Sequence, residues 1–162
     1  KKNNISNDIK GVKAITMVDN RWSRPDIKTT QLLPNVLAKT YANKKNAYEG
    51  IFIDNDGYVT EGSSSNIWVI NKNNEILTRE IDGKILSGIT RKTISQFAKN
   101  NNFKMLEKKF TKDEMLNSRE VFLTSASSFV TPIIEIDNIK IGTGIIGKTS
   151  IELRNLYFKN FD

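Results

Sequence analysis

Short apolar runs separated by polar turns recur along the chain, and this pattern predicts a protein rich in β-strands. Residues 67–70 (Ile-Trp-Val-Ile) form an unbroken apolar run, which is typical of a buried strand. The sequence Asp54-Asn55-Asp56-Gly57 predicts a hairpin turn between two further strands. We expect an antiparallel meander from residue 48 to residue 78. The segments predicted to be strands are 11–19, 48–54, 58–61, 67–70, 75–78, 103–110, 120–125, 130–136 and 139–141.

Other segments carry the spacing of helices. Val36, Leu37 and Tyr41 would form an apolar stripe on one helical face, together with Thr40. Pro34 suits the first turn of that helix, because its missing N–H would be unpaired there in any case. The sequence Thr111-Lys112-Asp113-Glu114 has the spacing of a capping box and opens a short helix. The longer predicted helices are 34–46, 88–101 and 147–161.

The amino-acid composition excludes several kinds of functional site. The 162 residues include no Cys and no His, which excludes disulfides, thiolate nucleophiles, imidazole bases and the commonest metal ligand. No apolar run approaches the ~20 residues of a membrane span, and the first residues are polar rather than an apolar export signal. We therefore expect a cytoplasmic protein with no metal and no membrane partner. The length suits one domain, residues 1–162.

The net charge of +7 raises the question of nucleic-acid binding. The lysines are scattered, and only the pairs Lys1-Lys2, Lys44-Lys45 and Lys108-Lys109 are adjacent. The sequence has no block of five or six like charges and no basic motif interspersed with aromatic residues. We therefore expect no nucleic-acid partner, whereas an anionic cofactor and carboxylate substrates would suit a basic protein.

Lys28 lies at a predicted junction between a strand and a helix, with Ile27, Leu32 and Leu33 nearby. An ammonium group held in such a place loses its proton more readily than one in water. The neutral amine that results can form a Schiff base with a carbonyl compound. Taken alone, however, the same pattern describes a solvated lysine, one of many in this chain.

Glu61 ends a predicted strand and is followed by the small polar run Gly62-Ser63-Ser64-Ser65-Asn66. Charged residues at hairpin ends are usually exposed, so a surface glutamate is the commoner interpretation. The small residues argue the other way, because they would let the backbone approach a ligand closely. Asn66 is on this reading either a ligand-binding residue or an ordinary loop residue.

Two further stretches offer donors for an anion. Gly88-Ile89-Thr90 precedes a predicted helix, whose free N–H groups and dipole bind anions. Thr90 is equally suited to be an ordinary helix cap. Ser125, Ala126 and Ser127 leave the end of a predicted strand and could add a second set of donors.

Four motifs, in the same order along the chain, resemble the class IV pyridoxal-phosphate-dependent aminotransferases. They are Arg21-Trp22 with Asp26-Ile27-Lys28 and Leu32-Leu33-Pro34-Asn35-Val36-Leu37-Ala38-Lys39; Thr60-Glu61-Gly62-Ser63-Ser64-Ser65-Asn66; Leu86-Ser87-Gly88-Ile89-Thr90-Arg91; and Leu123-Thr124-Ser125. Together they cover nearly the whole chain. Within class IV the resemblance is greatest to the D-amino-acid (D-alanine) aminotransferases, because of the run that begins at Leu32 and the triple serine.

The resemblance implies an α/β (α+β) fold, the D-amino-acid aminotransferase-like fold type IV. Its large C-terminal domain is a mixed, largely antiparallel sheet, or pseudo-barrel, flanked by helices. The implied activity is transamination between a D-amino acid such as D-alanine and a 2-oxo acid in a homodimer, with pyridoxal 5'-phosphate as cofactor. Branched-chain L-amino-acid aminotransferases, aminodeoxychorismate lyases and amine transaminases remain alternatives. So does a catalytically incomplete cofactor-binding fragment.

The family's smaller N-terminal domain has no counterpart here, since nothing before Gly11 resembles it. In the family that domain supplies an arginine to the phosphate and the residues that hold the substrate carboxylate. We therefore expect an enzyme as the full-length protein, and an incomplete one as this chain alone.

The resemblance also assigns roles to single residues. Lys28 takes the position of the Schiff-base lysine, which forms the internal aldimine and then moves a proton between Cα and the cofactor. Glu61 is implied to hold the pyridine nitrogen protonated, and Leu86 to pack on the ring. Relatives often carry a hydroxyl residue where Ala126 stands, so one side-chain donor is missing here. The other residues implied to bind the cofactor are Ser64, Ser65, Asn66, Gly88, Ile89, Thr90 and Ser125.

Overall fold

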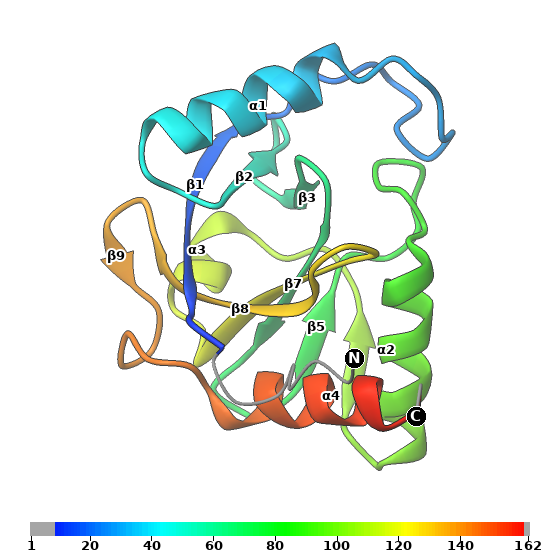
Figure 1. The fold of residues 1–162 in the computed structure, drawn as a ribbon. Coiled ribbons are helices and arrows are strands. Elements are labelled where there is room, and N and C mark those ends of the chain that lie inside the picture. Colours follow the sequence, from blue (N-terminus) through cyan, green and yellow to red (C-terminus); the bar gives the residue numbers. More distant parts are fainter. Residues whose placement is uncertain (1–8, 161–162) are drawn as a thin grey trace, which may run out of the picture.

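A curled sheet of nine strands dominates the structure, a computed structural model that describes residues 9–160 (Figure 1). Four helices of these residues lie around the sheet. In chain order the elements are β1 (Val12–Val18), α1 (Leu33–Lys44), β2 (Glu49–Ile53), β3 (Val59–Gly62), β4 (Asn66–Ile70), β5 (Ile76–Thr78), α2 (Ile89–Asn100), β6 (Met105–Glu107), α3 (Lys112–Leu116), β7 (Glu120–Ser125), β8 (Phe129–Ile136), β9 (Ile139–Lys140) and α4 (Lys148–Lys159).

The strands follow the order β3-β2-β1-β8-β7-β4-β5-β6, and β9 pairs with β8. The sheet is mixed, because β1 runs parallel to β2 and β8, and β5 parallel to β6, while the other pairs are antiparallel. The two ends of this order meet where Tyr58 bridges Thr111 and the Val59 N–H donates to the carbonyl of Phe110 at 2.9 Å. The sheet therefore curls into a partly closed barrel.

The predicted strands are confirmed, although the segment predicted over 103–110 keeps only three residues, Met105–Glu107, as β6. The predicted meander is wrong at one place. β2–β3 and β4–β5 are antiparallel hairpins, but β4 pairs with β7 instead of β3. A tight turn, closed by the bond from the Gly62 N–H to the Ser65 carbonyl at 2.7 Å, carries the chain from one part of the curled sheet to the other.

The apolar run in β4 is buried because it faces a hydrophobic cluster on each side. Ile67 and Val69 belong to the cluster inside the curl. Trp68 and Ile70 belong to the cluster beneath α2 and α4, where the Trp68 and Phe122 rings stack at 5.5 Å. Successive side chains of a strand point to opposite faces, so an unbroken apolar run is the pattern that burial on both faces requires.

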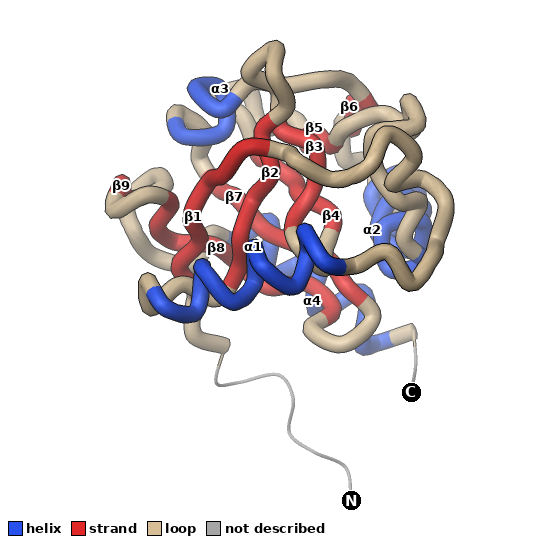
Figure 2. The backbone as a smooth tube through the Cα atoms, turned by 90° about the horizontal axis from the view of Figure 1, so that it is seen from above, coloured by secondary structure: helices blue, strands red, loops and turns tan. Residues whose placement is uncertain are grey.

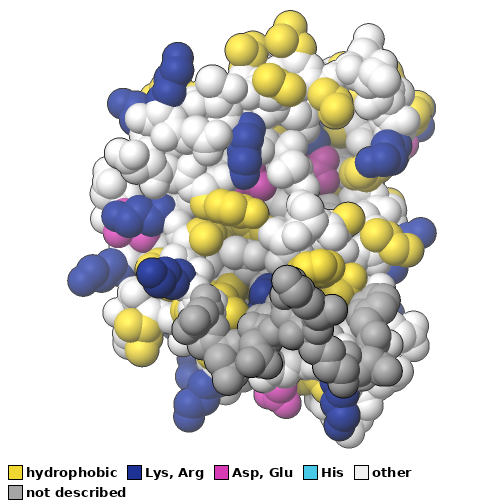
Figure 3. Space-filling model, viewed as in Figure 1, with side chains coloured by type: hydrophobic (Ala, Val, Ile, Leu, Met, Phe, Trp, Pro, Cys, Tyr) yellow, Lys and Arg dark blue, Asp and Glu magenta, His cyan; other side chains and the backbone are white. Residues whose placement is uncertain are grey.

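Helix α1 lies against β1 and β2 (Figure 2). Its buried residues are Ala38 and Ala42, not its large apolar residues. Val36, Leu37 and Tyr41 are 56%, 57% and 51% exposed, so the predicted stripe faces outward. The space-filling view shows apolar side chains gathered at the top of the molecule, where α1 lies (Figure 3). The spacing predicted the helix correctly. The residues that pack are small alanines, which let the helix backbone approach the strands closely.

The other predicted helices are confirmed at α2, α3 and α4, although Phe161, the last residue predicted in the closing helix, lies outside the described residues. Thr111 and Glu114 form the predicted capping box of α3. Glu120 caps α4 from β7, since its carboxylate accepts the N–H groups of Thr149 and Ser150 at 3.0 and 2.9 Å. Within residues 9–160 no helix is long and apolar enough to cross a membrane.

Candidate functional site

The candidate residues converge where several elements begin or end. Asp19 follows β1, Glu61 lies near the end of β3, and Asn66 begins β4. Gly88 precedes α2 as its N-cap. Ser125 ends β7 next to the pair formed by Asn66 and Thr124 in the β4–β7 ladder. Residues far apart in the sequence therefore meet at one edge of the sheet.

Glu61 is a buried carboxylate with three partners, and its side chain is 8% exposed. Its Oε2 accepts the Asn66 amide at 3.1 Å and the Leu86 N–H at 3.0 Å. Its Oε1 accepts the Nη1 group of Arg21. Burial raises the pKa of Glu61 to about 7, even though the Arg21 charge and these hydrogen bonds act to lower it. The carboxylate is therefore held in place while it retains an unusual affinity for a proton.

Arg21 joins Glu61 to a second carboxylate, that of Asp19. Its Nε and Nη2 donate to Asp19 Oδ1 and Oδ2 at 2.9 and 2.7 Å. Burial alone would lower the pKa of Arg21, but its hydrogen bonds to Asp19 and the two carboxylate charges outweigh burial and raise it. Burial likewise acts to raise the pKa of Asp19, and its contacts with Arg21 outweigh burial and leave that pKa below its ordinary value. All three groups therefore act as one electrostatic unit.

The sequence indicated Arg21 only as part of a motif, and Asp19 not at all. The single local signal is the spacing Asp19-x-Arg21 directly after a strand, where a carboxylate can accept from the arginine two residues later. The partner of this pair, Glu61, comes 40 residues after Arg21. No local pattern reports a contact over that distance.

Glu49, also missed in the sequence, holds the serine-rich turn that follows Glu61. The Glu49 side chain is 1% exposed and accepts the hydroxyls of Ser63 and Ser65, the latter at 2.9 Å. Ser64 is exposed, with its hydroxyl 3.4 Å from the same carboxylate. From α1, the Asn35 amide donates to the Ser63 carbonyl at 2.9 Å. In this structure the Ser63 and Ser65 hydroxyls thus point at Glu49.

Asn66, Leu86 and Gly88 are packed against one another. The Asn66 amide donates to the Leu86 carbonyl at 2.9 Å as well as to Glu61. A Cβ at position 88 would stand 2.5 Å from Asn66 Oδ1, so this close approach requires glycine. Leu86 and Gly88 are half-buried, which leaves part of each accessible beside Glu61.

The start of α2 presents groups that have no partner. Thr90 is buried, and no described residue hydrogen-bonds to its hydroxyl or to that of Ser87. Gly88 has an extended backbone at the N-cap and no side-chain cap. The prediction that Thr90 lies in the first turn of a helix is confirmed, whereas Ile89 is 70% exposed. Free N–H groups in a first helical turn and an unpaired hydroxyl favour an anion.

In the loop after β7 the serine hydroxyls bond to one another, and the Ser128 carbonyl accepts from Thr131 and Arg154 at 3.0 and 3.3 Å. Ser125 Oγ accepts the Ser128 N–H at 3.1 Å and lies 2.7 Å from the Ser128 hydroxyl. Ala126 and Ser127 are exposed. The loop starts next to Asn66, so its backbone lies at the same edge of the sheet as Glu61.

Lys28 lies in the segment that joins β1 to α1, and its side chain is exposed. Within residues 9–160 no group forms a hydrogen bond or an ion pair with its ammonium. Arg24 and Asp26, both earlier in this segment, pair with each other at 2.8 Å. The structure therefore places Lys28 in the same segment as Arg21 without fixing it to the carboxylate cluster.

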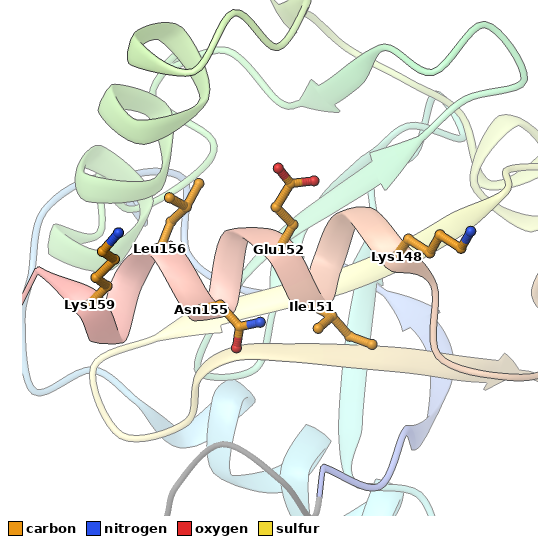
Figure 4. A pocket seen from close by; sticks show the side chains of 6 residues that line it. All are labelled: Lys148, Ile151, Glu152, Asn155, Leu156 and Lys159. Carbon is orange, nitrogen blue, oxygen red and sulfur yellow. The ribbon is translucent and has the colours of Figure 1, made fainter.

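A hollow of about 350 Å³ lies elsewhere, along α4 (Figure 4). Its lining residues are Lys148, Ile151, Glu152, Asn155, Leu156 and Lys159. They come from one helix, and none of them belongs to the candidate site. Among the described residues, no three carboxylates gather as a group that could hold a metal ion.

The raised pKa of Glu61 predicts a pH-dependent stability. Its folded-state pKa is about 7 against an ordinary value of 4.5, so protonation of Glu61 stabilises the folded state. This stabilisation is complete below pH 4.5 and is lost as the pH rises through 7. The shift corresponds to about 3 kcal/mol. Glu61→Gln should remove this pH dependence, so the free energy of unfolding of wild type should fall by about 3 kcal/mol relative to the variant between pH 5 and pH 8.

Urea unfolding of both proteins at the two pH values measures this difference. Gln cannot accept all the hydrogen bonds of Glu61, so a constant offset between the proteins is expected, and only the change with pH carries the prediction. The pKa values of Asp19 and Asp137 are lowered from 3.8, so both carboxylates stay ionised from pH 5 to pH 8 and do not contribute to the change. Parallel pH profiles would show that Glu61 titrates as an ordinary carboxylate.

The comparison with known sequences matches this chain to one family. The family model of class IV amino-transferases matches residues 3–136. The D-alanine aminotransferase of Bacillus licheniformis is 47% identical over 137 residues, which are 85% of this chain and 48% of that protein. The D-alanine aminotransferase of Staphylococcus haemolyticus is 41% identical over 149 residues, which are 92% of this chain and 52% of that protein. The chain thus spans about half the length of these relatives.

A solved structure agrees with the sequence comparison. A T.th. branched-chain amino acid aminotransferase with pyridoxamine 5'-phosphate is similar to this chain with a TM-score of 0.83 and 30% identity, over 92% of this chain and 50% of that one. This likeness confirms the expected fold of a mixed, curled sheet flanked by helices. The family match over residues 3–136, which contain all the residues converging at the sheet edge, leads to one conclusion: the chain belongs to the class IV aminotransferase family.

Proposed function

We propose that these residues form the cofactor-binding part of an aminotransferase that moves an amino group between a D-amino acid, such as D-alanine, and a 2-oxo acid. The family and the two D-alanine aminotransferase relatives support this proposal. The observation that carries it is Glu61, a buried carboxylate fixed by three donors yet left with a pKa of about 7. Such a group suits a ring nitrogen that must stay protonated.

The residues present fit pyridoxal 5'-phosphate at both of its ends. Glu61 would meet the ring nitrogen, with Asn66 and the Leu86 N–H fixing the carboxylate. The start of α2 would meet the phosphate, because Ser87 and Thr90 have buried hydroxyls without a partner among the described residues. Helix α2 has twelve residues, so its first turn adds free N–H groups and a dipole. Gly88 lets the backbone approach Asn66 closely, since a Cβ there would stand 2.5 Å from Asn66 Oδ1.

The cofactor, when bound, supplies an electron sink for the carbanion formed at the substrate's Cα. Lys28 provides the amine that bonds covalently to it, and later the base that moves the proton at Cα. Without His or Cys in the chain, a lysine amine is the group best suited to this proton transfer. Leu86 would pack on the ring, and Ser64, Ser65, Ile89, Ser125 and Ala126 complete the set of residues assigned to the cofactor.

The proposal extends to the whole protein. The chain spans about half the length of its relatives. We propose that the groups that hold the substrate carboxylate belong to the other half, as the resemblance implies. We propose a homodimer, as the resemblance implies, and a cytoplasmic location, as the composition led us to expect. The exposed stripe of Val36, Leu37 and Tyr41 on α1 supports a surface that another part of the assembly covers.

Substrate preference tests this proposal most simply. We expect the full-length protein to prefer D-alanine over L-leucine, with 2-oxoglutarate as acceptor, by about tenfold or more in kcat/KM. Initial rates with each amino acid at several concentrations give the ratio. The alternative is supported by a specific observation, the likeness to branched-chain aminotransferase structures at 30% identity. A higher kcat/KM for L-leucine would assign the protein to that group, and no transamination with either amino acid would refute the proposed activity.

A further inference from the structure

Two carboxylates share the one guanidinium of Arg21. Asp19 binds Nε and Nη2, and Glu61 binds Nη1. The Arg21 and Glu61 side chains are only 3% and 8% exposed, so water screens these charges weakly. With Glu61 ionised, one positive and two negative charges give the cluster a net charge of −1.

The Asp19 carboxylate is held in place by two further hydrogen bonds. Its Oδ2 accepts the Thr60 hydroxyl at 2.7 Å, and its Oδ1 accepts the Arg21 N–H at 3.2 Å. Thr60 directly precedes Glu61 in β3, so the two carboxylates are fixed by neighbouring positions of one strand. Their separation by a single guanidinium is therefore part of the fold.

Without Asp19 the charge balance would change. Arg21 paired with Glu61 alone is neutral overall, and a neutral pair does not favour a cation beside it. Arg21 keeps three further contacts: its Nη2 bonds to the Lys84 carbonyl at 3.1 Å and to the Thr60 hydroxyl at 3.3 Å, and the face of the Phe52 ring at 4.8 Å. The arginine can therefore stay in position when only the Asp19 charge is removed.

We propose that Asp19 is a positioning residue that acts through Arg21. The Asp19 carboxylate neutralises the guanidinium, so that the negative charge of Glu61 remains available to stabilise a protonated ring nitrogen. This inference rests on the proposed function and deepens it. The charged groups that act on Glu61 are Arg21 and Asp19, both from the segment that follows β1. From β4 and the segment before α2 come the neutral donors Asn66 and Leu86.

The test replaces Asp19 by the neutral isostere in the full-length protein, as Asp19→Asn. In the cofactor-free protein we expect the titration midpoint of Glu61, followed by ¹³C NMR of its carboxyl carbon, to fall by about one pH unit. In the cofactor-loaded protein we expect the ¹⁵N signal of a labelled pyridine nitrogen to shift toward the unprotonated form. We expect kcat to fall by about tenfold with little change in KM, because the ring is a weaker electron sink.

Asp137→Asn is the matched control. Asp137 also accepts from a cation, a threonine hydroxyl and a backbone N–H, those of Lys112 and Thr16, but it lies in the turn between β8 and β9. The Asp137→Asn substitution should lower stability without changing the titration midpoint of Glu61 or the ¹⁵N signal of the ring nitrogen. Asp19→Glu restores the charge and should return both readouts toward wild type. Asp19→Ser, a second neutral variant, gives the same comparison should Asp19→Asn not fold.

The outcomes separate this inference from the proposed function. A Glu61 midpoint that is unchanged in the neutral Asp19 variants, or one that moves equally in Asp137→Asn, overturns the role of Asp19. So does a shifted midpoint with an unchanged nitrogen signal and kcat. If the wild-type protein binds no cofactor, the proposed function fails and the functional role of Asp19 with it, while the midpoint still shows whether Asp19 and Glu61 are coupled.

Discussion

Lys28→Ala should slow the half-reaction of the full-length protein with D-alanine by at least about 10⁴-fold, because it removes both the covalent attachment and the proton-transferring base. The chain has no His or Cys that could replace the amine. The fold should be unaffected, since Lys28 is exposed and no group in residues 9–160 pairs with its ammonium. A change of stability within about 0.5 kcal/mol is expected for such a position.

Single-turnover absorbance at saturating cofactor measures the effect. Lys99→Ala is the matched control, because Lys99 is another exposed lysine and lies in the last turn of α2, away from the candidate site. It should leave the rate constant unchanged. A rate in Lys28→Ala within tenfold of wild type would mean that another group carries the proton.

Glu61→Gln has the second largest expected effect. The amide cannot carry the negative charge that favours a protonated ring nitrogen, and it offers one acceptor oxygen where the carboxylate offers two to Arg21, Asn66 and Leu86. Losing one group from a preorganised electrostatic site costs about 10²–10³ in rate. We expect that loss in the rate constant of the half-reaction, with cofactor still bound through its other contacts.

The same single-turnover assay tests this prediction, with cofactor content checked by absorbance. Glu135→Gln is the control, because Glu135 pairs with Lys13 at 2.8 Å on β8 and β1, and has no contact with the candidate site. A Glu61→Gln protein that keeps both its cofactor and its rate constant would show that the ring nitrogen does not depend on this carboxylate.

Local patterns were sufficient to predict the elements of this fold. The apolar run at 67–70, the hairpin turn at 54–57 and the capping box at Thr111 each appear in the structure where the sequence predicts them. Each depends on residues within one turn of a helix or one hairpin. Propensity and side-chain periodicity act over that distance, so the sequence reports them directly.

Contacts over long sequence distances could not be predicted in this way. The pairing of β4 with β7 joins segments far apart in the sequence, and it replaced the predicted continuation of the meander. The face of α1 that packs could not be predicted either, because Ala38 and Ala42 are less conspicuous in a pattern than Leu37 and Tyr41. Which face packs depends on the strands that the helix meets.

The candidate site shows the same division. Glu61, Asn66, Leu86 and Gly88 were assigned through their motifs, and the structure brings these four together. Thr90, assigned in the same way, lies in the first turn of α2. The groups that support them were not predicted, because Asp19 and Glu49 are single carboxylates in otherwise ordinary stretches. Their partners lie 41 and 16 residues away, at Thr60 and Ser65. Buried charge networks of this kind are visible only after the chain has folded.

Borohydride reduction of the cofactor-loaded, full-length protein tests the central claim most directly. Reduction fixes the cofactor to the lysine that holds it, and proteolysis followed by mass spectrometry identifies the modified peptide. We expect a single modified residue, Lys28, with the modification lost in Lys28→Ala. Modification of a different lysine, or none in a protein that has bound the cofactor, would contradict the assignment of this site.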